Sequence, residues 1–146
     1  MMNAWQSSTH FEDNCAENPC DANHAIDRNS WTGSVTTSSD SPSWTVELSK
    51  PAKIDRIDLI VNEWAINQKY YENIMVETAL DDHWNWRRNC IGVNSPRTLN
   101  SVESSIRCTE GKPLARYVKL IAFGGDSENE KQIPLYLNEV KIYGTG

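Results

Sequence analysis

Two short segments at opposite ends of the sequence carry oxygen-bearing side chains next to apolar residues. The side chains with this property are Asp27, Asn29, Ser34 and Glu139. Carboxylates, amides and hydroxyls are ligands for Ca²⁺, which binds six to eight oxygens in irregular geometry. If the fold brings the two ends of the chain together, this pattern predicts a calcium site. The alternative is that Asp27 and Asn29 form turns and that Glu139 lies on the surface.

Side chains arranged for catalysis are not evident in the sequence. It has no Gly-x-Ser-x-Gly motif, no His-Glu-x-x-His motif and no glycine-rich loop of the type that binds phosphate. Asp81 and Asp82 are adjacent after an apolar run, and we interpret them as the end of a strand. We therefore expect a binding protein and not an enzyme.

Two aromatic segments are candidates for contact with a ligand. The first contains His83, Trp84, Trp86 and Arg87. Its two indoles could stack on a sugar ring while the arginine binds hydroxyl groups; alternatively, both indoles point into the core and the basic residues are solvated. The second segment follows a predicted central strand as a loop, where an exposed Trp64 could be a contact hot spot or touch a lipid surface.

Five short segments alternate between apolar and polar residues or are rich in β-branched side chains, which is typical of strands. They are residues 44–48, 54–61, 74–80, 117–123 and 140–144. Lys50–Pro51 is expected to end the first of them, and no segment keeps a helical period. Short strands separated by polar loops predict an all-β fold, an antiparallel β-sandwich or jelly roll, in one domain over residues 1–146.

Four cysteines predict two disulfides and therefore an oxidising compartment. Cys15 and Cys20 are close enough in sequence to pair locally, and Cys90 and Cys108 would pair across a turn-forming segment. Zinc binding is the alternative, although the histidines lack the spacing that zinc ligands usually show. We expect a secreted or extracellular protein whose signal peptide has been removed, or one domain of a longer secreted chain.

The acidic charge balance excludes some partners. A formal net charge of −6 disfavours nucleic acid, because that binding depends on Lys and Arg neutralising phosphates. Contact with anionic membranes is disfavoured on the same ground. No apolar run approaches the roughly 18 residues that a membrane-spanning helix requires.

Several short motifs follow one another in a familiar order. They are residues 4–9 (AWQSST), Ala25–Asp27 followed by Asn29, Gly33–Ser34, residues 43–48 (SWTVEL) and residues 137–144 (LNEVKIYG). This order resembles the discoidin, or coagulation-factor C-type, fold of the galactose-binding-like superfamily. Within that superfamily the chain looks most like the F-type lectins, or fucolectins, over nearly its whole length.

The resemblance implies a structural calcium ion and one of the disulfides. The expected calcium ligands are the side chains of Asp27, Ser34 and Glu139 and the backbone carbonyls of His24, Asn29 and Asn138. The pair formed by Cys90 and Cys108 corresponds to a disulfide of these lectins. The pair formed by Cys15 and Cys20 does not, and would be a local link in the loop after the first strand.

The positions that correspond to the sugar site of fucose-binding members differ in charge. Those lectins carry a His after the Gly-Ser motif, then Arg-x-Asp, then a second basic residue. The corresponding residues here are Thr37, Glu63 with Ala65, and Lys69. Glu63 in place of Arg removes charge-assisted hydrogen bonds and puts an acceptor where a donor is expected. The resemblance therefore implies a specificity changed from fucose.

Recognition is the function that the resemblance implies. We expect a calcium-stabilised, lectin-like module that binds a glycan or glycoprotein through residues around Thr37, residues 63–71 and residues 83–88. A protein-interaction or cell-adhesion module that keeps the lectin scaffold without sugar binding is the alternative. Peripheral lipid binding through Trp64 is a third class. Lectin modules often gain avidity as homo-oligomers, so self-association is also expected.

Overall fold

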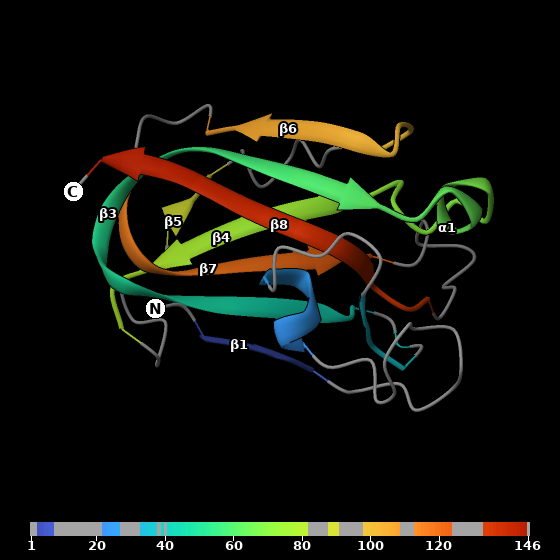
Figure 1. Ribbon diagram of the computed structural model, residues 1–146, viewed down its shortest axis with the longest axis horizontal. Helices are drawn as coiled ribbons and strands as arrows, with labels where there is room; N and C mark the ends of the chain where they lie inside the picture. Colours follow the sequence, from blue (N-terminus) through green and yellow to red (C-terminus); the bar gives the residue numbers. More distant parts are fainter. Residues whose placement is uncertain are drawn as a thin grey trace.

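The chain folds into antiparallel strands in two layers (Figure 1). A computed structural model describes residues 3–7, 22–26, 33–37, 39, 41–81, 88–90, 98–108, 113–123 and 133–145. Their elements, in chain order, are β1 (Asn3–Gln6), the 3₁₀ helix η1 (Ala22–Ile26), β2 (Ser34–Val35), β3 (Ser43–Val61), α1 (Glu63–Asn67), β4 (Ile74–Ala79), β5 (Arg88–Asn89), β6 (Glu103–Arg107), β7 (Leu114–Ala122) and β8 (Tyr136–Thr145). The predicted all-β sandwich is confirmed.

Strand β3 is long enough to belong to both layers. Its first part pairs with β1 and β7, and β7 continues the layer to β4 and β5. Its second part pairs with β6 on one side and with β8 on the other, and β8 pairs with β2. Residues far apart in the sequence are therefore joined through one central strand, as Figure 1 shows.

The prediction that Lys50–Pro51 ends a strand is wrong. The two predicted strands on either side of it are parts of β3, which bends there. The pairing of β3 with β7 shifts register between Glu47 and Ala52, and residues 49–51 are exposed. Proline cannot donate a backbone hydrogen bond, so it is tolerated where a strand bends out of its ladder. Pro51 therefore marks the crossing from one layer to the other.

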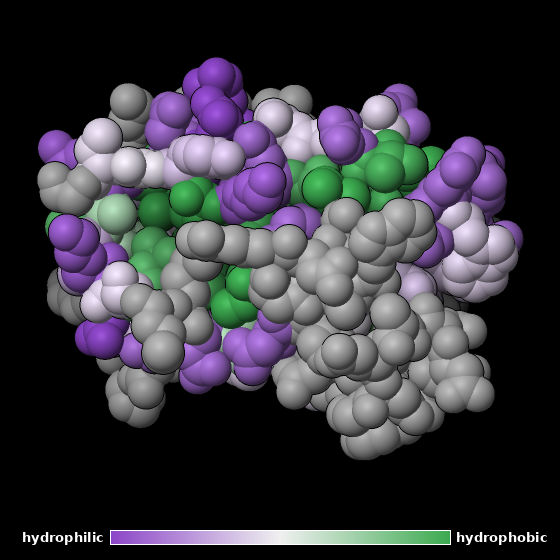
Figure 2. All heavy atoms as spheres, in the orientation of Figure 1, coloured by the Kyte–Doolittle hydropathy of each residue, from purple (hydrophilic) through white to green (hydrophobic). Residues whose placement is uncertain are grey.

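Apolar side chains from both layers meet in one core. Trp44, Ile57, Leu59, Val118 and Leu120 each have an exposed fraction of 1% or less. The Trp44 indole nitrogen also donates a hydrogen bond of 2.9 Å to the Ala22 backbone oxygen, which holds η1 over the core. The outward residues between these positions are polar. Among the described residues in Figure 2, hydrophobic surface forms a strip between hydrophilic side chains.

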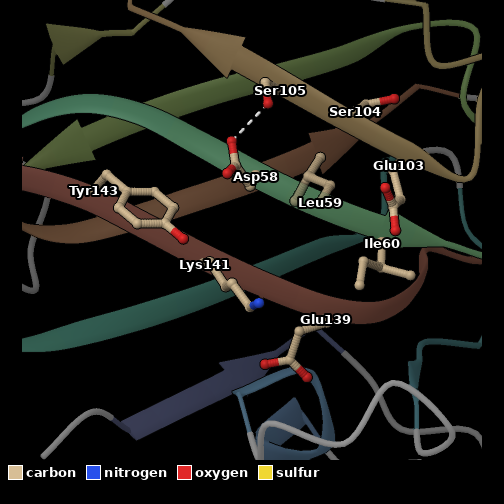
Figure 3. A pocket seen from close by; sticks show the side chains of 9 residues that line it. All are labelled: Asp58, Leu59, Ile60, Glu103, Ser104, Ser105, Glu139, Lys141 and Tyr143. Carbon is tan, nitrogen blue, oxygen red and sulfur yellow. Dashed lines mark hydrogen bonds between the residues drawn. The ribbon is translucent and has the colours of Figure 1, made fainter.

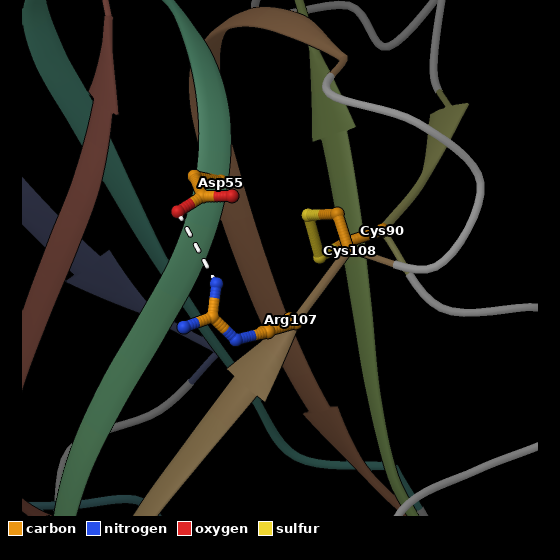
Figure 4. Close-up of a disulfide and its surroundings, with 4 residues drawn as sticks. All are labelled: Asp55, Cys90, Arg107 and Cys108. Atoms are coloured by element: carbon orange, nitrogen blue, oxygen red, sulfur yellow. Dashed lines mark hydrogen bonds and ion pairs between the residues drawn. A yellow bond between two sulfur atoms is a disulfide. The ribbon is translucent and has the colours of Figure 1, made fainter.

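A disulfide links the edges of the two layers (Figure 4). Cys90, which follows β5, is bonded to Cys108, which follows β6, as predicted. The backbone nitrogen of Cys90 donates to Val76 and that of Cys108 donates to Asp55, so each half-cystine is fixed to a different layer. Cys15 and Cys20 lie outside the described residues.

Two other expectations concern helices. The segment after the central strand was expected to be a loop, but residues 63–67 form the short helix α1. A single turn of helix is too short to show a hydrophobic period, so the sequence pattern could not reveal it. Among the described residues, no helix has the length and apolar character needed to cross a membrane.

Candidate functional site

The two oxygen-bearing segments meet where β2 pairs with the beginning of β8. Ser34 lies opposite Leu137 and Val35 lies opposite Tyr136 in antiparallel register. The Ser34 hydroxyl donates to the Leu137 backbone oxygen at 3.4 Å. Helix η1, which includes His24, packs against both β2 and β8. Within the described residues, the two oxygen-bearing segments therefore lie side by side.

The oxygens on β8 beside this junction are buried. Glu139 has an exposed fraction of only 4%, so its interpretation as a surface residue is wrong. Its Oε2 atom and the Oδ1 atom of Asn138 are fully shielded from solvent. A carboxylate is rarely buried unless a cation or several donors compensate for its lost hydration. The charge of the buried Glu139 carboxylate therefore has to be compensated within the fold.

Gly33 brings the β2 segment close to these oxygens. A Cβ atom at this position would lie 3.3 Å from Tyr136 Cε1, 3.4 Å from the Leu137 backbone oxygen and 3.9 Å from Asn138 Oδ1. The segment that carries Ser34 therefore lies against two oxygens of β8, the Leu137 backbone oxygen and Asn138 Oδ1, which are of the type that Ca²⁺ prefers. Asp27 and Asn29 and the side chain of His24 lie outside the described residues, among which no group of three His, Cys, Asp or Glu side chains is placed to hold a metal ion.

The α1 segment, residues 62–71, forms a second candidate site at the end of β3 (Figure 1). Asn62 caps the helix, and its side-chain oxygen accepts a hydrogen bond of 3.0 Å from the Ala65 backbone nitrogen. Such a cap compensates for a backbone donor that has no partner within the first turn. The chain then reverses at Lys69, whose φ of 63° lies in the left-handed region. A defined cap and turn give this segment a fixed shape.

An aromatic pair projects from the α1 segment. Trp64 is 56% exposed, the most exposed of the large apolar side chains that the structure describes. The Tyr70 ring packs edge-on against its indole, with ring centroids 5.7 Å apart and an interplanar angle of 74°. Glu63 and Lys69 are exposed on the same segment. An exposed indole held by a second ring presents a firm, partly apolar surface to a partner.

Tyr71 anchors this segment to the rest of the molecule. Its side chain is 1% exposed, and its hydroxyl donates to the Tyr136 backbone oxygen and accepts from the Asn62 backbone nitrogen. Burial raises the pKa of the Tyr71 phenol well above its usual value. Tyr136 lies opposite Val35, so Thr37, which is exposed just beyond β2, lies at the same end of the sandwich as the α1 segment.

The structure thus places some of the predicted ligand-binding residues together and leaves others undetermined. Glu63, Trp64 and Lys69 share the α1 segment, and Thr37 lies at the same end. His83, Trp84, Trp86 and Arg87 lie outside the described residues. The sequence analysis missed the roles of Asn62 and Tyr70; an Asn immediately before Glu63 was the available signal for a helix cap.

Comparison with solved structures identifies the architecture. The lectin domain of lectinolysin, in a structure with Lewis B antigen, superposes with a TM-score of 0.70 at 23% identity over 99% of this chain and 93% of that chain. An F-lectin (fucolectin) from striped bass (Morone saxatilis) serum gives a TM-score of 0.72 at 19% identity over 99% of this chain, which spans 46% of that protein. A Clostridium perfringens CBM32 module, in complex with GalNAc-β-1,3-galactose, gives a TM-score of 0.71 at 21% identity over 98% of this chain and 95% of that chain.

The chain has the fold of the F-type lectins. This fold is the discoidin-type, galactose-binding-like sandwich, which the resemblance of the short motifs predicted. No protein-family model matches the sequence, and a search of curated proteins also gave no match. The likeness to lectins is therefore visible in the three-dimensional structure far more clearly than in the sequence.

Proposed function

We propose that this protein is a calcium-stabilised recognition domain that binds a glycan, free or on a glycoprotein, through the α1 segment. The observation that carries the proposal is the exposed Trp64 held edge-on by Tyr70 on a capped and anchored turn. An indole can lie against the C–H face of a sugar ring, and aromatic residues fixed before binding lose little conformational entropy when a partner arrives.

The structural neighbours support carbohydrate as the class of ligand. The lectinolysin lectin domain forms a complex with Lewis B antigen, and the C. perfringens module forms one with GalNAc-β-1,3-galactose. The fold shared with them places loops at the ends of a rigid sandwich, where binding residues commonly lie. We infer that the α1 segment and Thr37 belong to such a binding end.

The chemistry of the α1 segment supports a specificity changed from fucose. Glu63 and Lys69 give it one carboxylate and one amine, and Trp64 gives it a large apolar surface. A site of this composition would bind a sugar by stacking on Trp64 and by accepting hydrogen bonds at the Glu63 carboxylate. A site with several arginines would instead donate bidentate hydrogen bonds to sugar oxygens. We therefore propose a glycan that presents an apolar ring face and hydroxyl donors.

Calcium is proposed as a structural component of this domain. Ser34, Asn138 and Glu139 would supply oxygen ligands, together with the predicted contributions of Asp27, His24 and Asn29. Its chemical contribution would be a fixed positive charge that compensates for the burial of Glu139. Bound there, it would tie β8 to the chain segment before β2. An extracellular location, where free calcium is abundant, is part of the same proposal.

A glycan array probed in the presence of calcium tests the proposal. Reproducible hits that disappear with the Trp64→Ala variant are expected. Trp5→Ala is the matched control, because Trp5 is also exposed, at 40%, and also packs edge-on against a tyrosine, Tyr117, but lies on β1. A blank array combined with saturable binding to a protein would favour the adhesion-module alternative. Sedimentation with anionic vesicles would instead favour lipid binding through Trp64.

A further inference from the structure

A second concave site lies on the outer face of the layer formed by β6, β3 and β8. A pocket of about 410 Å³ opens there, a volume in the range of small-ligand clefts. Its lining residues are Asp58, Leu59, Ile60, Glu103, Ser104, Ser105, Glu139, Lys141 and Tyr143 (Figure 3). No residue of the α1 segment lines it, so it is separate from the proposed recognition site.

The strand register arranges the side chains of this face in three rows. The rows are Glu103–Ile60–Glu139, Ser105–Asp58–Lys141 and Arg107–Arg56–Tyr143, each read from β6 through β3 to β8. The intervening residues Ile57 and Leu59 point into the core. Alternation along each strand therefore places the row residues on the same face, where Glu139 alone is buried, and the two neighbouring strands supply polar groups on both sides of β3.

The middle of the pocket is already ordered by its own contacts. Asp58 accepts hydrogen bonds from the Ser105 hydroxyl at 2.6 Å and from Arg56 Nε at 3.2 Å. The Arg56 guanidinium carbon lies 4.2 Å from the centre of the Tyr143 ring, in cation–π contact. Asp58, Arg56 and Tyr143 therefore hold one another in place before any ligand arrives, while about a third of the Asp58 and Arg56 side chains stays exposed.

The row at the other end of the pocket is acidic. Glu103 and Glu139 flank Ile60 from β6 and β8, and the nearest basic side chain in the lining is Lys141. Glu103 is exposed and takes part in none of the ion pairs formed between described residues. Figure 3 shows the Glu103 and Glu139 side chains on either side of Ile60. Glu103 therefore gives this end of the pocket an exposed negative charge.

We propose that this face is a second carbohydrate site, selective for an amino sugar with a free amine. A chain of glucosamine units has the required chemistry. Its hydroxyls fit the mixed donors and acceptors of Asp58 and Ser105, its ring faces fit Tyr143 and Ile60, and its ammonium groups fit Glu103. Charge-assisted hydrogen bonds between an ammonium and a carboxylate are among the stronger polar contacts in proteins. The proposal goes beyond recognition through the α1 segment.

Calorimetric titration with a glucosamine tetramer and with the N-acetylglucosamine tetramer tests the amine requirement. The two probes share their hydroxyls and rings, but acetylation removes the positive charge. The free amine form is expected to bind, about ten-fold more tightly than the acetylated form, because one charge-assisted contact is worth roughly that factor. Raising the salt concentration should weaken binding of the amine form only. No binding by the amine form, or equal binding by both forms, would overturn the proposal.

Variants locate the site. Glu103→Gln is expected to weaken binding of the glucosamine tetramer about ten-fold, and Tyr143→Ala should weaken it by a comparable factor. Glu72→Gln is the matched control, because Glu72 is an exposed carboxylate that does not line the pocket. Glu139 is left unchanged, since it is also a candidate calcium ligand. All variants alter exposed side chains, and equal melting temperatures would verify that they fold.

Two further results would contradict the assignment. Loss of glucosamine binding in Trp64→Ala, with no effect of Glu103→Gln, would place the amino sugar on the α1 segment and leave the pocket without this role. Binding of spermidine as tightly as the tetramer would show that the pocket selects charge alone and not a sugar. The proposed site predicts that neither occurs, and that glycans found through the α1 segment still bind when Glu103 is replaced.

Discussion

The hydroxyl of Tyr71 donates a hydrogen bond to the backbone oxygen of Tyr136, which lies 65 residues later in the chain. This bond joins the α1 segment to the beginning of β8, the strand that carries Asn138 and Glu139. The Tyr136 neighbour across the sheet is Val35, next to Ser34. The aromatic pair of the α1 segment and the junction of β2 with β8 are thus attached to the same short stretch of backbone.

Tyr71→Phe is expected to lower the free energy of unfolding. The change removes the donor to Tyr136 and leaves the Asn62 backbone nitrogen without its acceptor, while the ring keeps its packing. Losing a buried hydrogen bond in this way costs about 1–3 kcal/mol. Urea denaturation measures this loss in the free energy of unfolding. Tyr143→Phe is the control, because Tyr143 is 40% exposed. Equal losses in the two variants would contradict the prediction, because the buried hydroxyl of Tyr71 would then contribute no more than the exposed hydroxyl of Tyr143.

Stability should also fall at high pH through the same residue. Burial raises the pKa of the Tyr71 phenol in the folded state above its ordinary value of about 10. The contribution of this group is therefore complete below pH 10 and is lost as the pH rises above that value, because only the unfolded chain then releases the proton. Denaturation curves at pH 8 and pH 11 should show a smaller decrease for Tyr71→Phe than for the unmodified protein. An identical decrease in both would contradict this assignment.

Removing the disulfide is expected to destabilise the domain by about 3 kcal/mol. Cys90 and Cys108 are separated by 18 residues, and closing a loop of this size restricts the unfolded chain by roughly that amount. The double variant Cys90→Ala with Cys108→Ala should therefore melt at a lower temperature without changing its β-sheet circular dichroism. The ion pair between Arg107 and Asp55 beside the bond is exposed and spans 3.5 Å, so Arg107→Ala is expected to have little effect and serves as the control.

Calcium should raise the melting temperature. A ligand that binds only the folded state adds about 2.7 kcal/mol when its concentration is 100 times its dissociation constant. Chelation is expected to lower the melting temperature of the unmodified protein, and calcium should have little effect on Glu139→Gln. Glu47→Gln is a suitable control, because Glu47 forms its ion pair with Arg116 on the other layer. A melting temperature that chelator does not change would contradict the calcium proposal.

Local patterns were sufficient to predict the four longest strands, β3, β4, β7 and β8, but not the shorter β1, β2, β5 and β6. The β-branched run at residues 54–61 and the apolar run at residues 74–80 correspond to the second part of β3 and to β4. Pro51 misled the prediction, because a proline is a break in a straight strand but a permitted residue at a bend between two layers. The helix α1 was missed because five residues give no periodicity.

The sites differ in how far the sequence could reveal them. Ser34 and Glu139 were selected from the sequence as calcium ligands because calcium needs oxygen donors and because the motif order resembles that of known lectins; calcium binding stays a prediction. The pocket on β6, β3 and β8 was not recognisable, since it depends on register. Ser105 is 47 residues from Asp58 in sequence, and only the pairing of the two strands brings the hydroxyl against the carboxylate. Periodicity within one strand predicts which of its residues point outward. It does not predict which residues of the adjacent strands lie beside them.

The most direct test of the central claim is a calorimetric titration of the best array glycan into the calcium-loaded protein and two variants. Trp64→Ala is expected to weaken binding at least about ten-fold, as the loss of a central aromatic contact usually does. Trp5→Ala should bind as the unmodified protein does, because its aromatic pair lies on β1. Unchanged affinity in Trp64→Ala, with the fold intact by circular dichroism, would contradict recognition through the α1 segment.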